Sequence, residues 1–256
     1  MVTLAERPGL QAAFWPQKVR IWPEYMFHDR YSDRLWHYTF ETFPEFQLYM
    51  LDDEDAPVAV AQSMPIVWDG TLGDLPVGWY DILVRATAGH EAGRRPNTLS
   101  PIEIAIQPEY RGQGVSYRLI NALKNLATSR GFHAMLVAVR PSEKSNYPIT
   151  PMERYVRWRR ADGSPFDPWL RAHWRTGGEI LTIADPSMIV EGTVEQWEEW
   201  TGLEFPDSGE YIVPGALVPV HVDTTMNLVR YVEPNVWVHH PITTLRLSKE
   251  DDPRGR

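Results

Sequence analysis

The spacing of apolar residues predicts broken helices at the start of the chain and strands after them. Within residues 1–45, aromatic side chains recur at roughly helical spacing, and four prolines interrupt the run. Aromatic residues at this spacing usually belong to a hydrophobic core. Apolar runs at 46–51 and 57–67 then predict two strands. The acidic link at 52–55 predicts a solvated turn between them, although its four carboxylates could also hold a metal ion.

A strand–turn–helix–strand unit occupies the middle of the chain. After a predicted helix at 75–93, isoleucines alternate with other residues over 101–106, which is the pattern of a strand. Residues 115–130 carry apolar side chains at helical spacing and end at Gly131, a typical helix cap. A second apolar strand is predicted at 133–139. A right-handed crossover between neighbouring parallel strands is the usual solution for such a unit.

The C-terminal half begins with residues that are typical of helix starts. Three helices are predicted to begin at Thr150, Asp167 and Thr193, because each position has an N-cap side chain followed by proline or a capping-box partner. Glycines near 177–178 and at 202 are expected to close the second and third helix. The sequence therefore predicts additional helices in this half of the chain.

Strands are expected to return at the end of the chain. Apolar runs predict strands at 216–222, 226–232 and 236–239, and Glu233-Pro234-Asn235 between the last two predicts a hairpin. His239 and His240 would point to opposite faces of their strand, so they should not chelate one metal ion together. The order of elements predicts one α+β domain over 1–256, elaborated at the N-terminus and at 141–210.

Composition and charge narrow the possible functions. The 256 residues include no cysteine, which excludes disulfides, thiolate nucleophiles and cysteine-containing zinc sites. A net charge of -9 argues against a nucleic-acid backbone as the main partner and favours a cationic one. The first residues lack the order of a signal peptide, and no apolar stretch approaches the roughly 18–20 residues that cross a bilayer. We therefore expect a cytoplasmic protein with no membrane partner.

The turn from Arg111 to Ser116 is the strongest candidate for a chemical function. Gly112 and Gly114 remove side chains there, directly before a predicted helix. Backbone N–H groups at a helix start are unpaired and carry partial positive charge, so they suit a phosphate that can approach the glycines closely. The turn matches neither the dinucleotide fingerprint nor the nucleotide-triphosphate loop, whose Gly-Lys-Ser/Thr is absent.

The segment Ile104-Ala-Ile-Gln-Pro-Glu-Tyr-Arg-Gly-Gln-Gly-Val-Ser116 resembles the acyl-coenzyme A motif of the GNAT acyltransferases. That motif is Arg/Gln-x-x-Gly-x-Gly/Ala after a strand that ends in Val-x-Pro, and here Arg111 and Gly114 fill its first and fourth positions. Ser116 replaces the usual small residue. The resemblance covers the 40 or so residues up to Val139, and the order of their elements agrees with it.

The resemblance implies a mixed, splayed β-sheet flanked by helices, with coenzyme A between two diverging strands. Backbone groups of Ile104 and Ile106 would hold the pantetheine arm. The pyrophosphate would lie on the turn residues Arg111, Gly112, Gln113, Gly114, Val115 and Ser116. Family members often place an asparagine and a tyrosine acid after the second strand, and Asn146 with Tyr155 has approximately that placement, with Tyr147 as a rival to Tyr155.

Two further residues are candidate acids or bases. Glu103 could deprotonate an acceptor amine from the strand beside the thioester, or it could be a glutamate on the sheet surface. The segment Asp167-Pro-Trp-Leu-Arg-Ala-His173-Trp-Arg-Thr-Gly-Gly178 resembles a helix in the GNAT-like loading domains of polyketide synthases, whose histidine acts on the acyl thioester. His173 could accordingly be a general acid or base, or a histidine of the core.

We therefore expect an enzyme that transfers an acyl group, in the first place acetyl, from acetyl-CoA or another acyl-CoA to an amine. Transfer would be direct in a ternary complex, because the chain has no cysteine for a covalent intermediate. The expected acceptor is a small-molecule or peptide amine, with no metal cofactor, and exposed C-terminal strands could pair in a homodimer. The alternatives are acyl transfer to, or decarboxylation with, a carrier-protein thiol, and a non-catalytic acyl-CoA-binding module.

Overall fold

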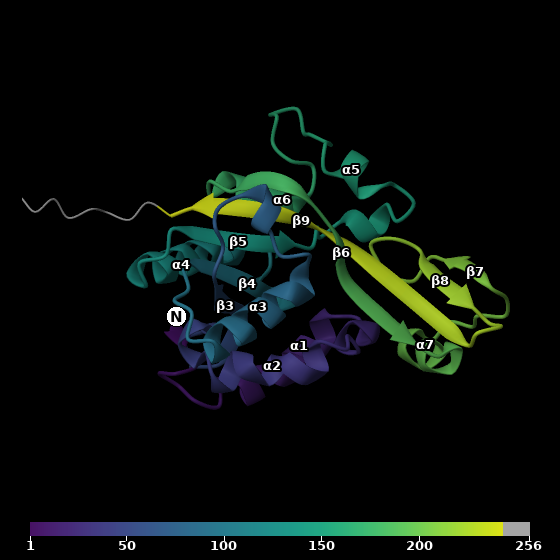
Figure 1. The fold of residues 1–256 in the computed structure, drawn as a ribbon, viewed down its shortest axis with the longest axis horizontal. Helices are drawn as coiled ribbons and strands as arrows, with labels where there is room; N and C mark the ends of the chain where they lie inside the picture. The colour runs from purple at the N-terminus through teal and green to yellow at the C-terminus, as the bar shows by residue number, and fades with distance from the viewer. Residues whose placement is uncertain (243–256) are drawn as a thin grey trace, which may run out of the picture.

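Short helices open the chain and cover one face of the sheet that follows. The computed structural model describes residues 1–242, and Figure 1 traces them from the purple N-terminal helices to the yellow C-terminal strand. The predicted broken helices are confirmed, since Pro23 precedes one new helical turn and Pro44 opens another. The elements of this segment are β1 (Val2–Thr3), α1 (Leu10–Ile21), η1 (Glu24–Phe27), α2 (Ser32–Glu41) and η2 (Pro44–Phe46).

The middle of the chain follows the predicted order of elements. β4 and β5 are parallel neighbours joined through α4, as the crossover pattern predicts. The acidic link is a turn, because the Asp52 carboxylate accepts hydrogen bonds from the amides of Glu54 and Ala56. The elements here are β2 (Leu48–Leu51), β3 (Pro57–Ile66), η3 (Leu72–Asp74), α3 (Trp79–Glu91), β4 (Thr98–Ile106), η4 (Pro108–Tyr110), α4 (Val115–Ser129) and β5 (Ala134–Val139).

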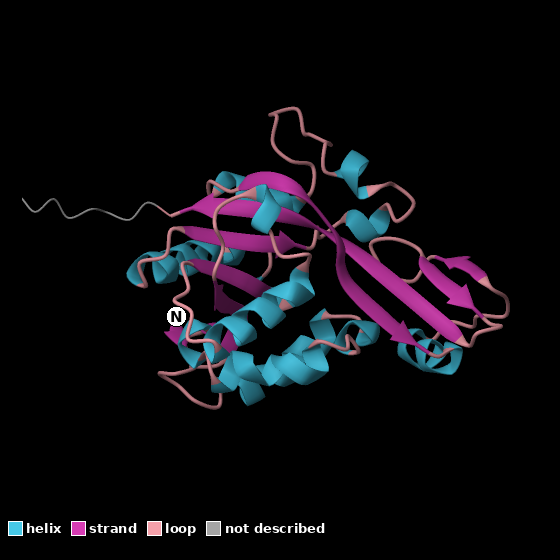
Figure 2. Ribbon diagram, viewed as in Figure 1, coloured by secondary structure: helices cyan, strands magenta, loops and turns pink. Residues whose placement is uncertain are grey.

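Helices cover both faces of this part of the sheet. In β2, Tyr49 packs with Phe14 of α1, whereas its neighbours Leu48 and Met50 belong to the main core with the buried face of α4. Successive strand residues point to opposite faces, so α1 and α4 lie on opposite sides of the sheet. Figure 2 shows the N-terminal helices and α3 grouped along the lower side of the strands.

The C-terminal half contributes both helices and long strands. Its helices begin as predicted at two of the three positions. The Asp167 carboxylate caps α6 and the Thr193–Gln196 capping box begins α7. The elements are η5 (Lys144–Asn146), α5 (Met152–Tyr155), α6 (Pro168–Arg175), β6 (Glu179–Gly192), α7 (Val194–Thr201), β7 (Gly209–Tyr211), β8 (Val220–Asp223) and β9 (Leu228–Pro241).

The predicted hairpin at Glu233-Pro234-Asn235 is wrong, because β9 runs through these residues as one strand. Met188 of β6 is in register with Glu233, and Ala184 with Asn235, so several β6 residues lie opposite Pro234. A proline cannot donate a ladder hydrogen bond, and an irregularity in the partner strand accommodates that loss. The chain reverses instead between β8 and β9.

Two other details of this half differ from the prediction. The helix expected from Thr150 is a single turn whose N-cap is Pro151, with no side-chain cap. β6 was not predicted at all, because its polar residues and Pro186 interrupt the alternation that marks a strand. β6 and β9 run side by side and carry the smaller strands and α7 away from the central sheet (Figure 1).

The described residues form an open, mixed sheet of nine strands with helices packed against it. Its order is β1-β2-β3-β4-β5-β9-β8-β7, with β6 on the other edge of β9, and β4–β5 is its parallel pair. This confirms the α+β class and the mixed sheet. Among residues 1–242, no helix combines the length and the apolar character needed to cross a membrane.

Candidate functional site

β4 and β5 begin side by side and then separate. In the described chain their register consists of Thr98 with Ala134 and Leu99 with Met135, although both strands continue well beyond these pairs. The Ser100 hydroxyl donates a hydrogen bond of 2.6 Å to the Leu136 carbonyl at the point of separation. Beyond it, the part of β4 with Ile104 and Ile106 faces β5 without ladder pairing. A cofactor arm can therefore bind along this strand edge.

The turn from Arg111 to Ser116 lies at the end of this diverging strand. Gly112 and Gly114 have φ of 76° and 74°, a region that favours glycine, and Gly114 is the N-cap of α4 with no side chain of its own. A methyl group placed on either Cα would meet nothing within 4 Å. There is thus room beside both glycines, and the amides at the start of α4, which have no intrahelical partners, can bind a pyrophosphate there. Arg111 is exposed, and its Nε donates to the Ile106 carbonyl at 3.2 Å.

β4 contains a bulge where it separates from β5. Gln62 of β3 is in register with Glu103, and Ser63 with Pro101, so Ile102 is an extra residue in β4. The Ile102 carbonyl accepts a hydrogen bond of 2.7 Å from the indole Nε1 of Trp79, at the start of α3. The bulge is thereby held by a side chain instead of the neighbouring strand.

Glu103 follows the bulge and is not on the surface. Its side chain is only 5% exposed, and its carboxylate accepts hydrogen bonds from Lys18 Nζ at 2.9 Å and from Trp22 Nε1 at 2.7 Å. The Lys18 ammonium also lies 4.3 Å from the centre of the Trp36 ring. The expectation of a sheet-surface glutamate is therefore wrong. Glu103 is a buried carboxylate with a cationic and an aromatic partner.

A second buried ion pair lies at the end of β5. Arg140 Nε binds both carboxylate oxygens of Glu233, at 3.1 and 2.9 Å, and its Nη2 donates to the Gly215 carbonyl. Burial alone would lower the pKa of Arg140, but the Glu233 carboxylate raises it. The Tyr231 hydroxyl donates to the same carboxylate at 2.6 Å, and burial together with Glu233 raises its pKa well above the ordinary value.

Hydrogen bonds connect this ion pair to the bulge in β4. The Asn235 amide donates to Glu233, and Asn235 Oδ1 accepts from the Ser187 hydroxyl at 2.7 Å. The Ser187 oxygen in turn accepts the backbone N–H of Trp79 at 2.9 Å. Trp79 is therefore held at its backbone by β6 and at its indole by β4. Gly78 allows this approach, since a Cβ there would lie 2.3 Å from Ser187 Cα.

Tyr155, a predicted acid, lies in the core of the C-terminal half. Its hydroxyl donates to Asp167 Oδ2 at 2.9 Å, and burial and the Asp167 charge raise its pKa. Tyr147 is half-buried against the Tyr155 ring, and its carbonyl accepts from Lys144 Nζ. Asn146 is exposed at the end of η5. The roles of these residues in the reaction stay predictions.

His173 is a buried histidine of α6 that contacts a second one. Its Nδ1 lies 2.9 Å from His240 Nε2, and burial lowers the pKa of both rings. His239 points to the other face, where its ring meets Trp68 edge-on. The predicted opposite orientation of His239 and His240 is thus confirmed. Within residues 1–242, no three side chains of His, Cys, Asp or Glu gather as a metal site would require.

Sequence reasoning missed Lys18, Trp22, Trp79, Arg140 and Glu233. One signal was available, because Phe14, Lys18 and Trp22 follow each other at a spacing of four, the first two on one face of α1 and Trp22 at its C-cap. A lysine between two buried-type aromatics on that face calls for a buried counter-charge. No such spacing pointed to Arg140 or Glu233, because these two partners lie far apart along the chain.

Comparisons with known proteins agree with this arrangement. The sequence profile of the "Acetyltransferase (GNAT) family" matches residues 8–148. Arginine N-acetyltransferase avaD of Aspergillus versicolor is 34% identical over 271 residues, which cover 94% of this chain and 93% of that protein.

Two solved structures share the fold over nearly the whole chain. The loading GNATL domain of CurA from Lyngbya majuscula has a TM-score of 0.61 at 16% identity, covering 92% of this chain and 95% of that one. The GphF GNAT-like decarboxylase in complex with isobutyryl-CoA has a TM-score of 0.59 at 17% identity, covering 93% and 97%. At these identities the likeness concerns the fold.

Proposed function

Because this chain belongs to the acetyltransferase (GNAT) family, we propose that it transfers an acetyl group from acetyl-CoA to a nitrogen of a small cationic acceptor. The observation that carries the donor side is the open glycine turn at the start of α4, next to the diverging strands β4 and β5. Amides there can bind the pyrophosphate, and the edge of β4 can bind the pantetheine arm.

The carboxylate of Glu103 is our candidate for the base. In direct transfer the acceptor nitrogen attacks the thioester carbonyl, the C–N bond forms, the C–S bond breaks, and coenzyme A leaves as a thiolate. The proton lost by the nitrogen would go to Glu103, directly or through water, and the thiolate would take up a proton from an acid or from solvent. Lys18 and Trp22 would keep the carboxylate in place between these steps.

The acid is less clearly marked than the base. The Tyr155 hydroxyl already donates a hydrogen bond to Asp167, and His173 bonds to His240 inside the core. Tyr147 is the half-buried member of the predicted set, which makes it the better candidate to reach a bound thiolate. Acyl transfer to a carrier-protein thiol is the second candidate. That alternative depends on an accessible His173, and His173 is buried.

The acceptor class comes from the relative and from the charge of this protein. The Aspergillus versicolor protein is named for arginine, and the net charge of -9 favours a cationic acceptor. We therefore propose arginine, or a compound with an arginine-like side chain, as the acceptor.

Release of free thiol from acetyl-CoA tests the proposal. The purified protein would be mixed with acetyl-CoA and, one at a time, with arginine, agmatine, lysine and neutral amines, and the acetylated product identified by mass spectrometry. We expect thiol release that depends on a cationic acceptor. If no acceptor in the panel caused thiol release, or if only neutral amines did, the proposal would be overturned.

A further inference from the structure

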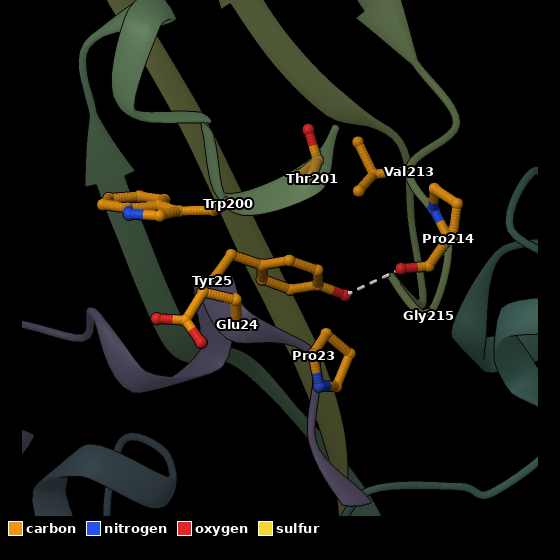
Figure 3. A pocket seen from close by; sticks show the side chains of 8 residues that line it. All are labelled: Pro23, Glu24, Tyr25, Trp200, Thr201, Val213, Pro214 and Gly215. Carbon is orange, nitrogen blue, oxygen red and sulfur yellow. Dashed lines mark hydrogen bonds between the residues drawn. The ribbon is translucent and has the colours of Figure 1, made fainter. Parts of the chain in front are cut away.

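A pocket of about 400 Å³ lies between η1 and the segment that joins β7 to β8. Figure 3 shows that the Tyr25 ring crosses the middle of its lining. Trp200 and Glu24 lie on one side of this ring, and the Val213–Gly215 segment lies on the other. The volume is within the range typical of small-molecule sites, which is about 300–1,000 Å³.

The walls of this pocket are fixed by packing. Tyr25 is 1% exposed and stacks on Trp197 with ring centres 5.3 Å apart, while its hydroxyl points to the Pro214 carbonyl. Trp200 stacks on His28 at 4.0 Å. Gly215 allows the opposite wall to approach, because a Cβ on it would lie 2.9 Å from the Pro23 ring. The pocket is therefore formed before any ligand binds.

The charge around the pocket suits a cation. The Glu24 carboxylate is 56% exposed, and Thr201, the last residue of α7, also lines the pocket, so the negative end of that helix lies nearby. The half-buried Trp200 ring can attract a cation, whereas the buried Tyr25 ring supports the wall from behind. The Arg140 guanidinium near the lining is paired with Glu233, and the Glu24 carboxylate lies 3.1 Å from His28 Nε2.

A chain of side-chain contacts links the lining of the pocket to Glu103. Gly215, which lines the pocket, accepts a hydrogen bond of 2.6 Å from Arg140 Nη2. The Arg140 guanidinium lies 5.9 Å from the centre of the Trp22 ring, and Trp22 Nε1 donates to Glu103 at 2.7 Å. One arginine and one tryptophan side chain thus separate the pocket from the candidate base.

We propose that this pocket binds a charged group of the acceptor, with Glu24 as its counter-ion and Tyr25 and Trp200 as its aromatic walls. This rests on the proposed N-acetyl transfer and adds the substrate class. The acceptor carries a second ammonium or guanidinium group besides the nitrogen that is acetylated. The second group lies in the pocket while the reacting nitrogen reaches Glu103.

Two measurements test this assignment. The first is isothermal titration of L-arginine into the CoA-saturated protein, and the second is turnover of arginine with acetyl-CoA. Glu24→Gln removes the charge and keeps the shape, and Glu24→Arg reverses the charge. The matched control is Glu41→Gln, an exposed glutamate at the end of α2. Loss of a charged hydrogen-bond partner should weaken arginine binding about tenfold or more in Glu24→Gln and further in Glu24→Arg. Affinity for CoA and the melting temperature should stay at the level of the control.

The outcomes separate this inference from the proposed function. If the wild type acetylates arginine and both Glu24 variants bind it as Glu41→Gln does, the pocket assignment is wrong and the proposed function stands. If arginine binds in a Glu24-dependent manner but is not acetylated, the pocket assignment holds and arginine is not the acceptor. If arginine does not bind, the pocket assignment is wrong, and the proposed function is overturned as well if no cationic acceptor of the panel reacts.

Discussion

Acid should destabilise this protein through the buried pair of His173 and His240. Burial lowers the pKa of both rings, and that of His240 falls from the ordinary 6.5 to about 4. A group whose pKa is lower in the folded state stabilises the fold above its unfolded pKa. That stability is lost as the pH falls, because the unfolded chain binds a proton that the folded chain excludes.

The size of the effect follows from the two pKa values of His240. Each pH unit between them corresponds to about 1.4 kcal/mol. Between pH 7.5 and pH 5.0 the unfolded state becomes protonated while the folded pair stays neutral. The free energy of unfolding should therefore fall by about 2 kcal/mol from His240 alone. His173 acts in the same direction.

Urea unfolding followed by tryptophan fluorescence at the two pH values measures this loss. His240→Gln keeps a hydrogen-bonding group near His173 and removes one titrating ring, so its loss between pH 7.5 and 5.0 should be about 2 kcal/mol smaller than that of the wild type. His221→Gln changes an exposed histidine and should behave as the wild type. Equal pH dependence in His240→Gln and the wild type would refute the reasoning.

Three further predictions concern the glycine turn, the Lys18–Glu103 pair and Gly78. Gly114→Val should raise the KM for acetyl-CoA at least tenfold. The control Gly163→Val introduces the same strain at a similar φ outside the site and should leave this KM unchanged. Equal KM values in the two variants would argue against a phosphate site at the glycine turn. Glu103→Gln should lower kcat about 100-fold or more with CoA binding retained, and Lys18→Met should lower it less; a kcat near that of the wild type would remove Glu103 as the base. Gly78→Ala should lower the free energy of unfolding by about 1–3 kcal/mol in urea titrations, because its Cβ would overlap the backbone of β6; an unchanged midpoint would contradict the close contact.

The donor side of the site was largely predictable from the sequence. Strand, turn and helix follow one another without interruption from Ile104 to Ser116, so local pattern and turn chemistry describe the whole cradle. Gly112 and Gly114 were expected to let a phosphate approach the backbone, and both have a positive φ that favours glycine. The crossover from β4 to β5 followed from the pattern of the longer segment 101–139.

The C-terminal strands show where local pattern is insufficient. Glu233-Pro234-Asn235 has the composition of a turn. The sequence of these residues does not reveal that the partner strand β6 has an irregularity opposite the proline. The Glu233 and Asn235 side chains are buried because Arg140 and Ser187 bind them. Polar residues in a strand interior are tolerated when partners from distant segments satisfy them, and those partners are not visible in a local window.

The donor and acceptor sides of the candidate site differ in how far apart their residues lie along the chain. The proposed donor turn is made of neighbouring residues, whereas the candidate acceptor side joins Lys18 to Glu103 and Arg140 to Glu233, pairs that are 85 and 93 residues apart. Changes in α1, η1 or the segment after β7 can therefore alter the acceptor site without touching the glycine turn. Acceptor specificity should thus follow Trp22, Glu24 and Gly215, and a related chain that keeps the turn but changes these residues should still bind acetyl-CoA while accepting a different amine.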